Sequence, residues 1–534
     1  MERRTLLKSA AALGALGGAA GVSGLATPDS AFAAAAAGAA QAPDQIAATI
    51  QRMLASIPKD FEPDYVRNAV LPFFLTSFYV GERPVLPMID VNFTKENALP
   101  FDFWGLIYKD WQPTPEEGVT VFLQGLEKRG ENNLRKRIYF SAMTPDLYAP
   151  MYAAKVKTFF DGLMGDQFAG KPFMRHYLDY YWDIYWDLHL GVKGDAIPAK
   201  VREIGEAFNT VLAHRNPLLP VTHENYMKVR ERLDFLKAWI DHRLGEIESG
   251  QAQHAEQTIA YYWLKNAGDG AHFSKADVVF ECFHNFVALS QWGNTIFGIM
   301  SRLSDNAGDP AVRAAFQKVM SGDYDNAKGA PYTPLQMFVM ELFRVVMPNA
   351  GSISAVEGSR ASFFGASPQD SIGVRLEWHS YISTPHTSTS VYPIHWQDPE
   401  AFDPDRYLKV PTSADITEEH CRKIGLARCP FEITGFAVKD GRRVNVTNSG
   451  FGTVFGVVDG VAEPVCDHAG FSPFGFGYRR CPGEQLTISV FEEFLRKVWR
   501  DKIVFHKLNL PNPGQVPIGP VTVIADDFGF SRAT

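Results

Sequence analysis

Residues Phe474 to Gly483 read F-G-F-G-Y-R-R-C-P-G, and this decapeptide decides the fold prediction. It places Cys481 between a glycine-rich loop and a segment, 484–500, that has the periodicity of a helix. Gly475 and Gly477 have no Cβ, so the backbone of the loop is able to pass close to a flat object. The decapeptide therefore indicates a thiol presented beside a flat ligand.

Two basic residues and a helix start surround this thiol. Arg479 and Arg480 add positive charge, and the helix that follows offers amide donors and the positive end of its dipole. Both effects lower the pKa of a thiol, so we expect Cys481 to be a thiolate, the form that binds metal. The alternative without a metal is a buried cysteine beside a helix start.

The decapeptide matches F-x-x-G-x-R-x-C-x-G at every fixed position, and here the chain resembles the cytochrome P450 family. The resemblance implies a mainly α fold with a minor β part (α+β), in which haem b lies between a central helix and the cysteine loop. It makes Cys481 the axial ligand of the iron, and a thiolate in that position favours O–O cleavage. The other loop residues that it places against the haem are Phe474, Gly475, Arg479 and Gly483.

Two further segments carry the resemblance. Glu341 and Arg344 form E-x-x-R inside a predicted helix, where residues three apart share one side. Residues 398–407 read D-P-E-A-F-D-P-D-R-Y and are similar to the family's P-x-x-F-x-P-x-R-[FY] segment. The resemblance implies that Arg406 joins Glu341 and Arg344 in a structural network behind the haem.

The haem propionates need cationic partners, and the bidentate fork of arginine suits a carboxylate. Arg479 is the first candidate by its place in the motif. Arg137 is the second candidate. Relatives carry Trp or His four residues before this arginine, whereas this chain has Asn133 there. Arg360 is the third, and for Arg137 and Arg360 an ordinary surface arginine is the alternative.

The substrate side of the haem departs from the family pattern. Relatives that activate dioxygen usually carry [AG]-G-x-[DE]-T on the central helix, whereas residues 291–295 read Q-W-G-N-T. Thr295 keeps the alcohol, but Asn294 replaces the acid and does not shuttle protons as a carboxylate does. These two are the predicted catalytic residues; a kink at Gly293 without a catalytic role is the alternative. Residues 281–285 (E-C-F-H-N) with Asn294 are also loosely similar to the hydroperoxide lyase and allene oxide synthase branch.

Length and composition fit a large globular enzyme. The chain has 534 residues, 46% of them hydrophobic, with 39 phenylalanines and a formal net charge of −8. An interior this aromatic is able to enclose a large apolar cofactor, and the negative net charge predicts no nucleic-acid partner. The family resemblance implies a hydrophobic small-molecule substrate, such as a fatty acid or a hydroperoxide. Beyond the N-terminus there is no apolar run of about 18 residues, so we expect no transmembrane span in the mature chain.

The first residues resemble a twin-arginine export signal. Arg3 and Arg4 precede a mildly apolar stretch that ends at Ala31-Phe32-Ala33, and we expect residues 1–33 to be removed on export to the periplasm or beyond. An ordinary secretory signal or an uncleaved anchor is the alternative. Residues 34–43 are expected to be a disordered tether, and 44–534 a single domain with an insertion around 411–468.

Five cysteines are present, which are Cys282, Cys421, Cys429, Cys466 and Cys481. If Cys481 binds iron, an exported protein is able to pair some of the others. Their spacing favours a disulfide between Cys421 and Cys429. The equal alternative is that both are buried free thiols.

Helical patterns cover most of the chain. Strands are expected within 374–394 and a hairpin over 450–461, and the aromatic stripe over 173–190 is interpreted as core. The longest apolar segment, 277–303, is expected to be the central helix. The other expected helices are 44–54, 119–129, 132–140, 198–214, 223–247, 256–267, 334–346 and 484–500.

Three classes of function follow. The first is a haem-thiolate monooxygenase, which needs an external electron donor, or a peroxygenase, which uses hydrogen peroxide. The second is a lyase or isomerase that acts on lipid hydroperoxides without a redox partner. The third is a non-catalytic haem-binding protein. Export and the missing acid favour peroxide over dioxygen.

Overall fold

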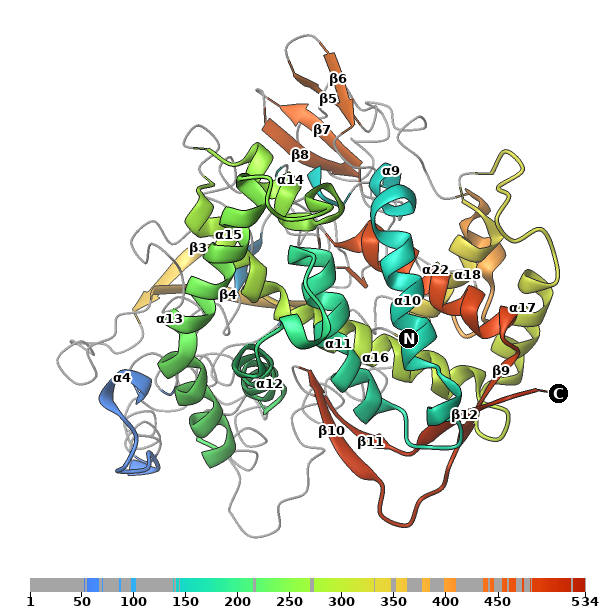
Figure 1. Ribbon diagram of the computed structural model, residues 1–534, viewed down its shortest axis with the longest axis horizontal. Coiled ribbons are helices and arrows are strands. Elements are labelled where there is room, and N and C mark those ends of the chain that lie inside the picture. Colours follow the sequence, from blue (N-terminus) through green and yellow to red (C-terminus); the bar gives the residue numbers. More distant parts are fainter. Residues whose placement is uncertain are drawn as a thin grey trace.

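Helices dominate the part of the chain that the computed structural model describes (Figure 1). The described residues are 52, 55–66, 70, 86–87, 98–101, 138, 141–143, 145–214, 218–268, 273–330, 332–346, 352–362, 377–384, 398–409, 436–439, 442–445, 454–458, 461–466, 473–474, 481, 483–519 and 522–533. The helices are α4 (Pro63–Tyr65), α9 (Pro145–Leu147), α10 (Ala153–Leu163), α11 (Met174–Leu190), α12 (Ala199–His214), α13 (Pro220–Glu248), α14 (Ile259–Asn266), α15 (Lys275–His284), α16 (Ala288–Leu303), α17 (Pro310–Met320), α18 (Pro334–Val346) and α22 (Glu484–Arg500).

Most of the expected helices are confirmed within these residues. The patterns over 173–190, 198–214, 223–247, 256–267, 334–346 and 484–500 correspond to α11, α12, α13, α14, α18 and α22. The helices expected over 44–54, 119–129 and 132–140 fall almost entirely outside the described residues, as do the signal segment and the tether. None of the helices described combines the length and apolar character that a membrane crossing requires.

The central helix is not continuous, so the prediction of one helix over 277–303 is wrong. α15 begins at a capping box, in which Ser274 and Asp277 exchange side-chain and backbone hydrogen bonds, and ends at His284. Residues Asn285–Val287 form a 3-10 turn, after which α16 continues to Leu303. α16 continues through Gly293 as part of one helix.

Strands make up the minor part of the fold. One sheet has the order β1-β4-β3-β2, with β1 parallel to β4 and the other neighbours antiparallel. The remaining strands form antiparallel pairs, β10 with β11, β12 with β9, β5 with β6 and β7 with β8. The strands are β1 (Leu86–Pro87), β2 (Ala98–Phe101), β3 (Ser352–Ser362), β4 (Glu377–Thr384), β5 (Phe436–Lys439), β6 (Arg442–Asn445), β7 (Val454–Val458), β8 (Val461–Cys466), β9 (Ile503–Lys507), β10 (Gly514–Gly519), β11 (Thr522–Asp526) and β12 (Phe528–Arg532).

Two strand predictions are confirmed. β4 lies within 374–394, and a hairpin is present near the range 450–461, although β7 and β8 extend it to residue 466. The segment 411–468 carries both β5–β6 and β7–β8, which lie together at the top of Figure 1.

The aromatic helix α11 lies in the core, as expected from its stripe. It ends where Gly191 adopts a left-handed conformation with φ 68°, which a residue without a Cβ adopts easily. Tyr181, Trp182 and Trp186 are almost fully buried. α11 packs on α10 and α16, and α10 packs in turn on α22, so this group of helices fixes the position of the segment that follows Cys481.

Candidate functional site

Cys481 lies three residues before the start of α22. Its backbone amide donates to the carbonyl of Phe474 at 2.8 Å, which closes the cysteine loop at its base. The ring of Phe474 packs against Phe343 of α18, with ring centroids 5.0 Å apart. The loop is thereby anchored to α18, and Cys481 is held at the amide-rich end of a helix, where negative charge is favoured.

The two cysteines whose surroundings the structure describes differ in exposure. Cys481 is exposed, whereas Cys282 on α15 is fully buried. Burial raises the pKa of the Cys282 thiol, and the neighbouring charge of Glu281 raises it further. A buried thiol of this kind is inert, while an exposed one at a helix start has the setting of a metal-binding or reactive thiolate.

The other predicted loop and propionate residues are described only in part. Gly483 precedes α22, and a Cβ added there would lie 3.8 Å from Cys481 Sγ, an ordinary contact that leaves room for a side chain. Arg360 lies on β3, within the stretch where the pairing of β3 with β4 shifts register. The predicted residues outside the described part are Arg137, Gly475 and Arg479, together with Cys421 and Cys429.

Asn294 and Thr295 lie on α16. Thr295 is almost fully buried, and its hydroxyl donates to the carbonyl of Gln291 in the preceding turn at 2.8 Å. Gly293 is required by packing, because a Cβ there would lie 2.3 Å from Ile518 of β10 and 2.9 Å from the ring of Tyr177. The glycine therefore allows β10 and α11 to approach α16.

α16 and α22 run in the same direction (Figure 1). Near the start of α22, the indole of Trp292 donates to the hydroxyl of Thr487 at 3.3 Å. Just beyond the ends of both helices, the amide of Asp305 donates to the carbonyl of Phe505 at 2.9 Å. These two contacts fix the register between the central helix and the helix that follows Cys481.

The structure brings Glu341, Arg344 and Arg406 together. Arg344 donates to both carboxylate oxygens of Glu341, at 2.7 and 2.9 Å, and Arg406 donates to one of them at 3.1 Å. Arg344 also donates to the carbonyls of Pro399 and Ala401. The network thus joins α18 to the segment 398–409.

Tyr407 is a member of this network that the sequence-based prediction missed. Its hydroxyl donates to Glu341 at 3.1 Å, and burial, followed by the charge of Glu341, raises its pKa well above the usual value. The signal was present, because Tyr407 fills the last position of the motif that ends in R-[FY]. Burial alone would lower the pKa of Arg344, but its bonds to Glu341 raise it overall.

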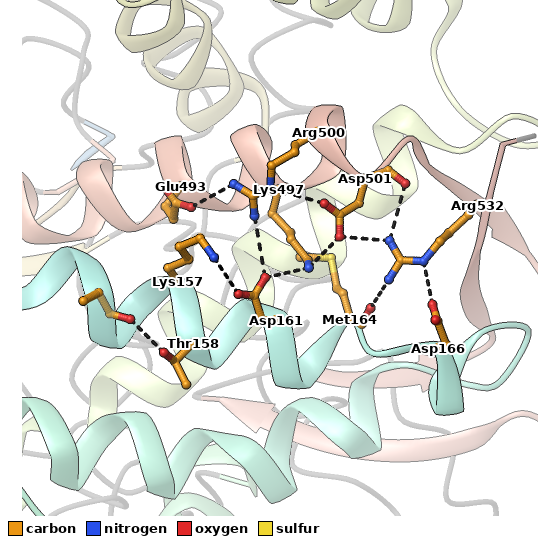
Figure 2. Close-up of polar contacts among 11 residues, drawn as sticks. Lys157, Thr158, Asp161, Met164, Asp166, Glu493, Lys497, Arg500, Asp501 and Arg532 are labelled. Atoms are coloured by element: carbon orange, nitrogen blue, oxygen red, sulfur yellow. Dashed lines mark hydrogen bonds and ion pairs between the residues drawn. The ribbon is translucent and has the colours of Figure 1, made fainter.

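Charged side chains also tie α22 to α10 and to the C-terminal strand (Figure 2). The ammonium of Lys497 lies 2.6 Å from both Asp161 of α10 and Asp501. Arg532 of β12 pairs with Asp501 at 2.9 Å and with Asp166 at 2.6 Å. Lys497 is buried, so this cluster fixes α22 more firmly than surface pairs would.

Solved structures resemble this arrangement over most of the chain. A cyanobacterial CYP120A1 with retinoic acid bound matches with a TM-score of 0.54 at 14% identity, over 84% of this chain and 88% of that one. The haem domain of cytochrome P450DA matches with a TM-score of 0.52 at 12% identity, over 84% and 87%. The chain has the cytochrome P450 fold. The α+β prediction is therefore confirmed.

A third structure with the P450 fold is a variant of cytochrome P450 OleT in complex with arachidonic acid. It has a TM-score of 0.51 and 13% identity, over 85% of this chain and 90% of that chain. No family model and no curated protein sequence matches the chain. At these identities the likeness shows the P450 fold, and the chemistry has to be argued from the residues themselves.

The described residues fit a haem held by a thiolate. Within the P450 fold, Cys481 is exposed at the start of α22, the position that suits a thiolate ligand. The Phe474–Cys481 bond and the Phe343 contact fix the loop from behind. The Glu341 network holds α18 behind the same loop, so the donor is held in place by packing and by hydrogen bonds.

Proposed function

We propose that the protein is a haem-thiolate oxidoreductase with Cys481 as the axial ligand of haem b. The single observation that carries this proposal is the exposed thiol of Cys481 at the start of α22 in a chain with the cytochrome P450 fold. When bound, a thiolate-ligated haem supplies the cleavage of an O–O bond.

The chain's own residues have defined parts in this proposal. The loop base at Phe474 and Cys481 holds the sulfur, and the first turn of α22 stabilises its negative charge. Arg479, Arg137 and Arg360 are the proposed propionate partners, by their places in the sequence. Asn294, which has a donor and an acceptor, and Thr295 are the proposed polar groups on the substrate side.

We expect a hydrophobic substrate with a long apolar body. Two structures with the same fold hold retinoic acid and arachidonic acid, which are both long apolar carboxylic acids. An aromatic, largely apolar interior is suited to a ligand of this class. A fatty acid or fatty-acid hydroperoxide is therefore the first substrate to test.

Peroxide is the favoured oxidant. Asn294 replaces the acid that delivers protons when dioxygen is used, and the expected export removes the protein from cytoplasmic NADPH. Hydrogen peroxide already contains both electrons and both protons, so it requires no redox partner. A fusion of residues 1–43 to a reporter that is active only after export as a folded protein tests the export step.

One comparison separates the three modes of turnover. The purified protein is supplied with a fatty acid and hydrogen peroxide, with a fatty acid and a reductase system, or with a fatty-acid hydroperoxide alone. Product from the first supports the peroxygenase, and product only from the second supports the monooxygenase. Consumption of the hydroperoxide without any reductant supports the lyase or isomerase.

A further inference from the structure

The break in the central helix is held by two tyrosines of α11. The hydroxyl of Tyr185 donates to the carbonyl of Cys282 at 2.6 Å, and that of Tyr177 donates to the carbonyl of Leu289 at 2.7 Å. These carbonyls lie on either side of the 3-10 turn Asn285–Val287. Because the tyrosines supply donors where the helical pattern changes, the break is a fixed feature of the fold.

A buried acid–base pair immediately precedes this break. Glu281 and His284 are one helical turn apart, with 3.0 Å between Glu281 Oε2 and His284 Nδ1. Their relative exposures are 0% and 3%, and Phe280 stacks on the imidazole with ring centroids 5.2 Å apart. Withdrawing a carboxylate from water is costly unless a partner compensates for it, and the imidazole of His284 is the partner here.

The pair faces away from α11. Phe286, in the 3-10 turn, packs against Trp182 and Trp186 of α11. His284 is two positions earlier, which is more than half a turn in an α-helix and about two-thirds of a turn in a 3-10 helix, so its side chain leaves on a different side from Phe286.

The register between α16 and α22 places Cys481 at the same height along the helix axes as the break in the central helix. Trp292 contacts Thr487, and the two helices run in the same direction. Cys481 comes six residues before Thr487, so the matching point on the central helix lies about six residues before Trp292, at the 3-10 turn.

From this geometry we propose that Glu281 and His284 form the proton-accepting pair of the site, acting on a protonated oxygen ligand such as a hydroperoxide. The inference rests on the proposed haem-thiolate function. Nδ1 faces Glu281, so Nε2 is the nitrogen that takes the proton from the ligand's oxygen when the ligand binds. The same proton is returned to the departing oxygen as the O–O bond breaks, so a hydroperoxide leaves as an alcohol, or hydrogen peroxide as water, and no net proton is consumed. The haem-thiolate group, when bound, would supply the two electrons for this reduction. Glu281 is the positioning residue, which stabilises the imidazolium.

Hydrogen cyanide tests this pair, because it is a neutral weak acid at pH 7 and loses a proton when it binds ferric haem. In the haem-loaded wild type, we expect the pair to keep that proton, and a pH indicator in weakly buffered solution will record no release. Release of one proton per haem would overturn the proposal. This measurement uses the native sequence, so it is independent of how well any variant folds.

Two substitutions provide a second test of the pair. In Glu281→Gln and His284→Gln, cyanide binding and hydrogen peroxide consumption should slow by roughly 10²–10⁴-fold, and a proton should appear in solution. Unchanged rates in both variants would overturn the proposal.

His223→Gln is the matched control, because His223 pairs with Glu62 at 2.6 Å beside α4, on the side of Figure 1 opposite α22. Its rates and proton balance should equal those of the wild type, and equal slowing in this control would show that the effect is not specific to the pair. A protein that binds no haem would overturn the proposed function itself, whereas a haem-loaded protein that releases the proton overturns only this inference.

Discussion

Arg344 and Glu341 are joined by two hydrogen bonds of 2.7 and 2.9 Å, and neither side chain has any exposed surface. Such a pair is costly to bury, and its cost is offset only when every partner is in place. The additional donors are Arg406, the hydroxyl of Tyr407 and the amide of Asp403. Removing one member therefore leaves a buried charge without compensation.

Glu341→Gln should lower the free energy of unfolding by about 3–5 kcal/mol, because Arg344 would keep its charge in the core. Urea denaturation followed by circular dichroism measures this change. Arg175→Gln is the control, since Arg175 and Asp179 form an exposed pair at 3.7 Å; its effect should stay below about 1 kcal/mol. Equal effects in the two variants would show that the buried network does not stabilise the fold.

Gly293→Ala should destabilise the protein by about 1–3 kcal/mol, because the new Cβ would overlap Ile518 and Tyr177. Ile518→Ala in the same chain should recover part of this loss, and a double-mutant cycle measures the coupling. Gly245→Ala provides the control. Nothing lies within 4 Å of a Cβ at Gly245 of α13, so alanine there should be neutral or stabilising by up to about 1 kcal/mol. Additive effects of the Gly293 and Ile518 substitutions would contradict the packing explanation.

Glu492 on α22 makes stability depend on pH. Burial raises its pKa from 4.5 to about 7; Asp325 and Glu493 act in the same direction, and Arg496 opposes them. The folded state thus retains a proton that the unfolded chain loses near pH 4.5. The contribution of Glu492 to the free energy of unfolding is fully present below about pH 4.5, and it is lost as the pH rises through about 7.

The size of this loss is on the order of 3 kcal/mol, at about 1.4 kcal/mol for each unit of pKa. Glu492→Gln should remove this part of the pH dependence, which chemical denaturation at a series of pH values between 4 and 8 will measure. A variant whose stability falls with pH as steeply as that of the wild type would refute the assignment to Glu492.

Local signals predicted much of the fold. α18 begins at Pro334 and α11 ends before Gly191, and both limits follow from residues that start or stop helices. The break at Asn285–Val287 has no such signal, because no glycine or proline marks it. It depends on hydroxyls of Tyr177 and Tyr185, which come from another helix and are distant in the sequence.

In the candidate site, too, local sequence predicts some residues, and packing between distant segments decides others. The pattern F-x-x-G-x-R-x-C-x-G singles out Cys481 from the sequence alone, because the chemistry lies in one short segment. Glu281 and His284 have helical spacing that is visible in the sequence, but their burial follows from packing that no local pattern encodes. The contact between Trp292 and Thr487, which sets their level relative to Cys481, joins residues far apart in the chain.

The most direct test of the central claim is the ferrous–carbon monoxide spectrum of the haem-loaded protein. Ligation by Cys481 predicts the red-shifted Soret band of a thiolate-bound haem in the wild type and its loss in Cys481→Ser. Cys282→Ser, which changes the buried cysteine, should keep the band. A histidine-type band in the wild type, or an unchanged spectrum in Cys481→Ser, would contradict the assignment of Cys481 as the haem ligand.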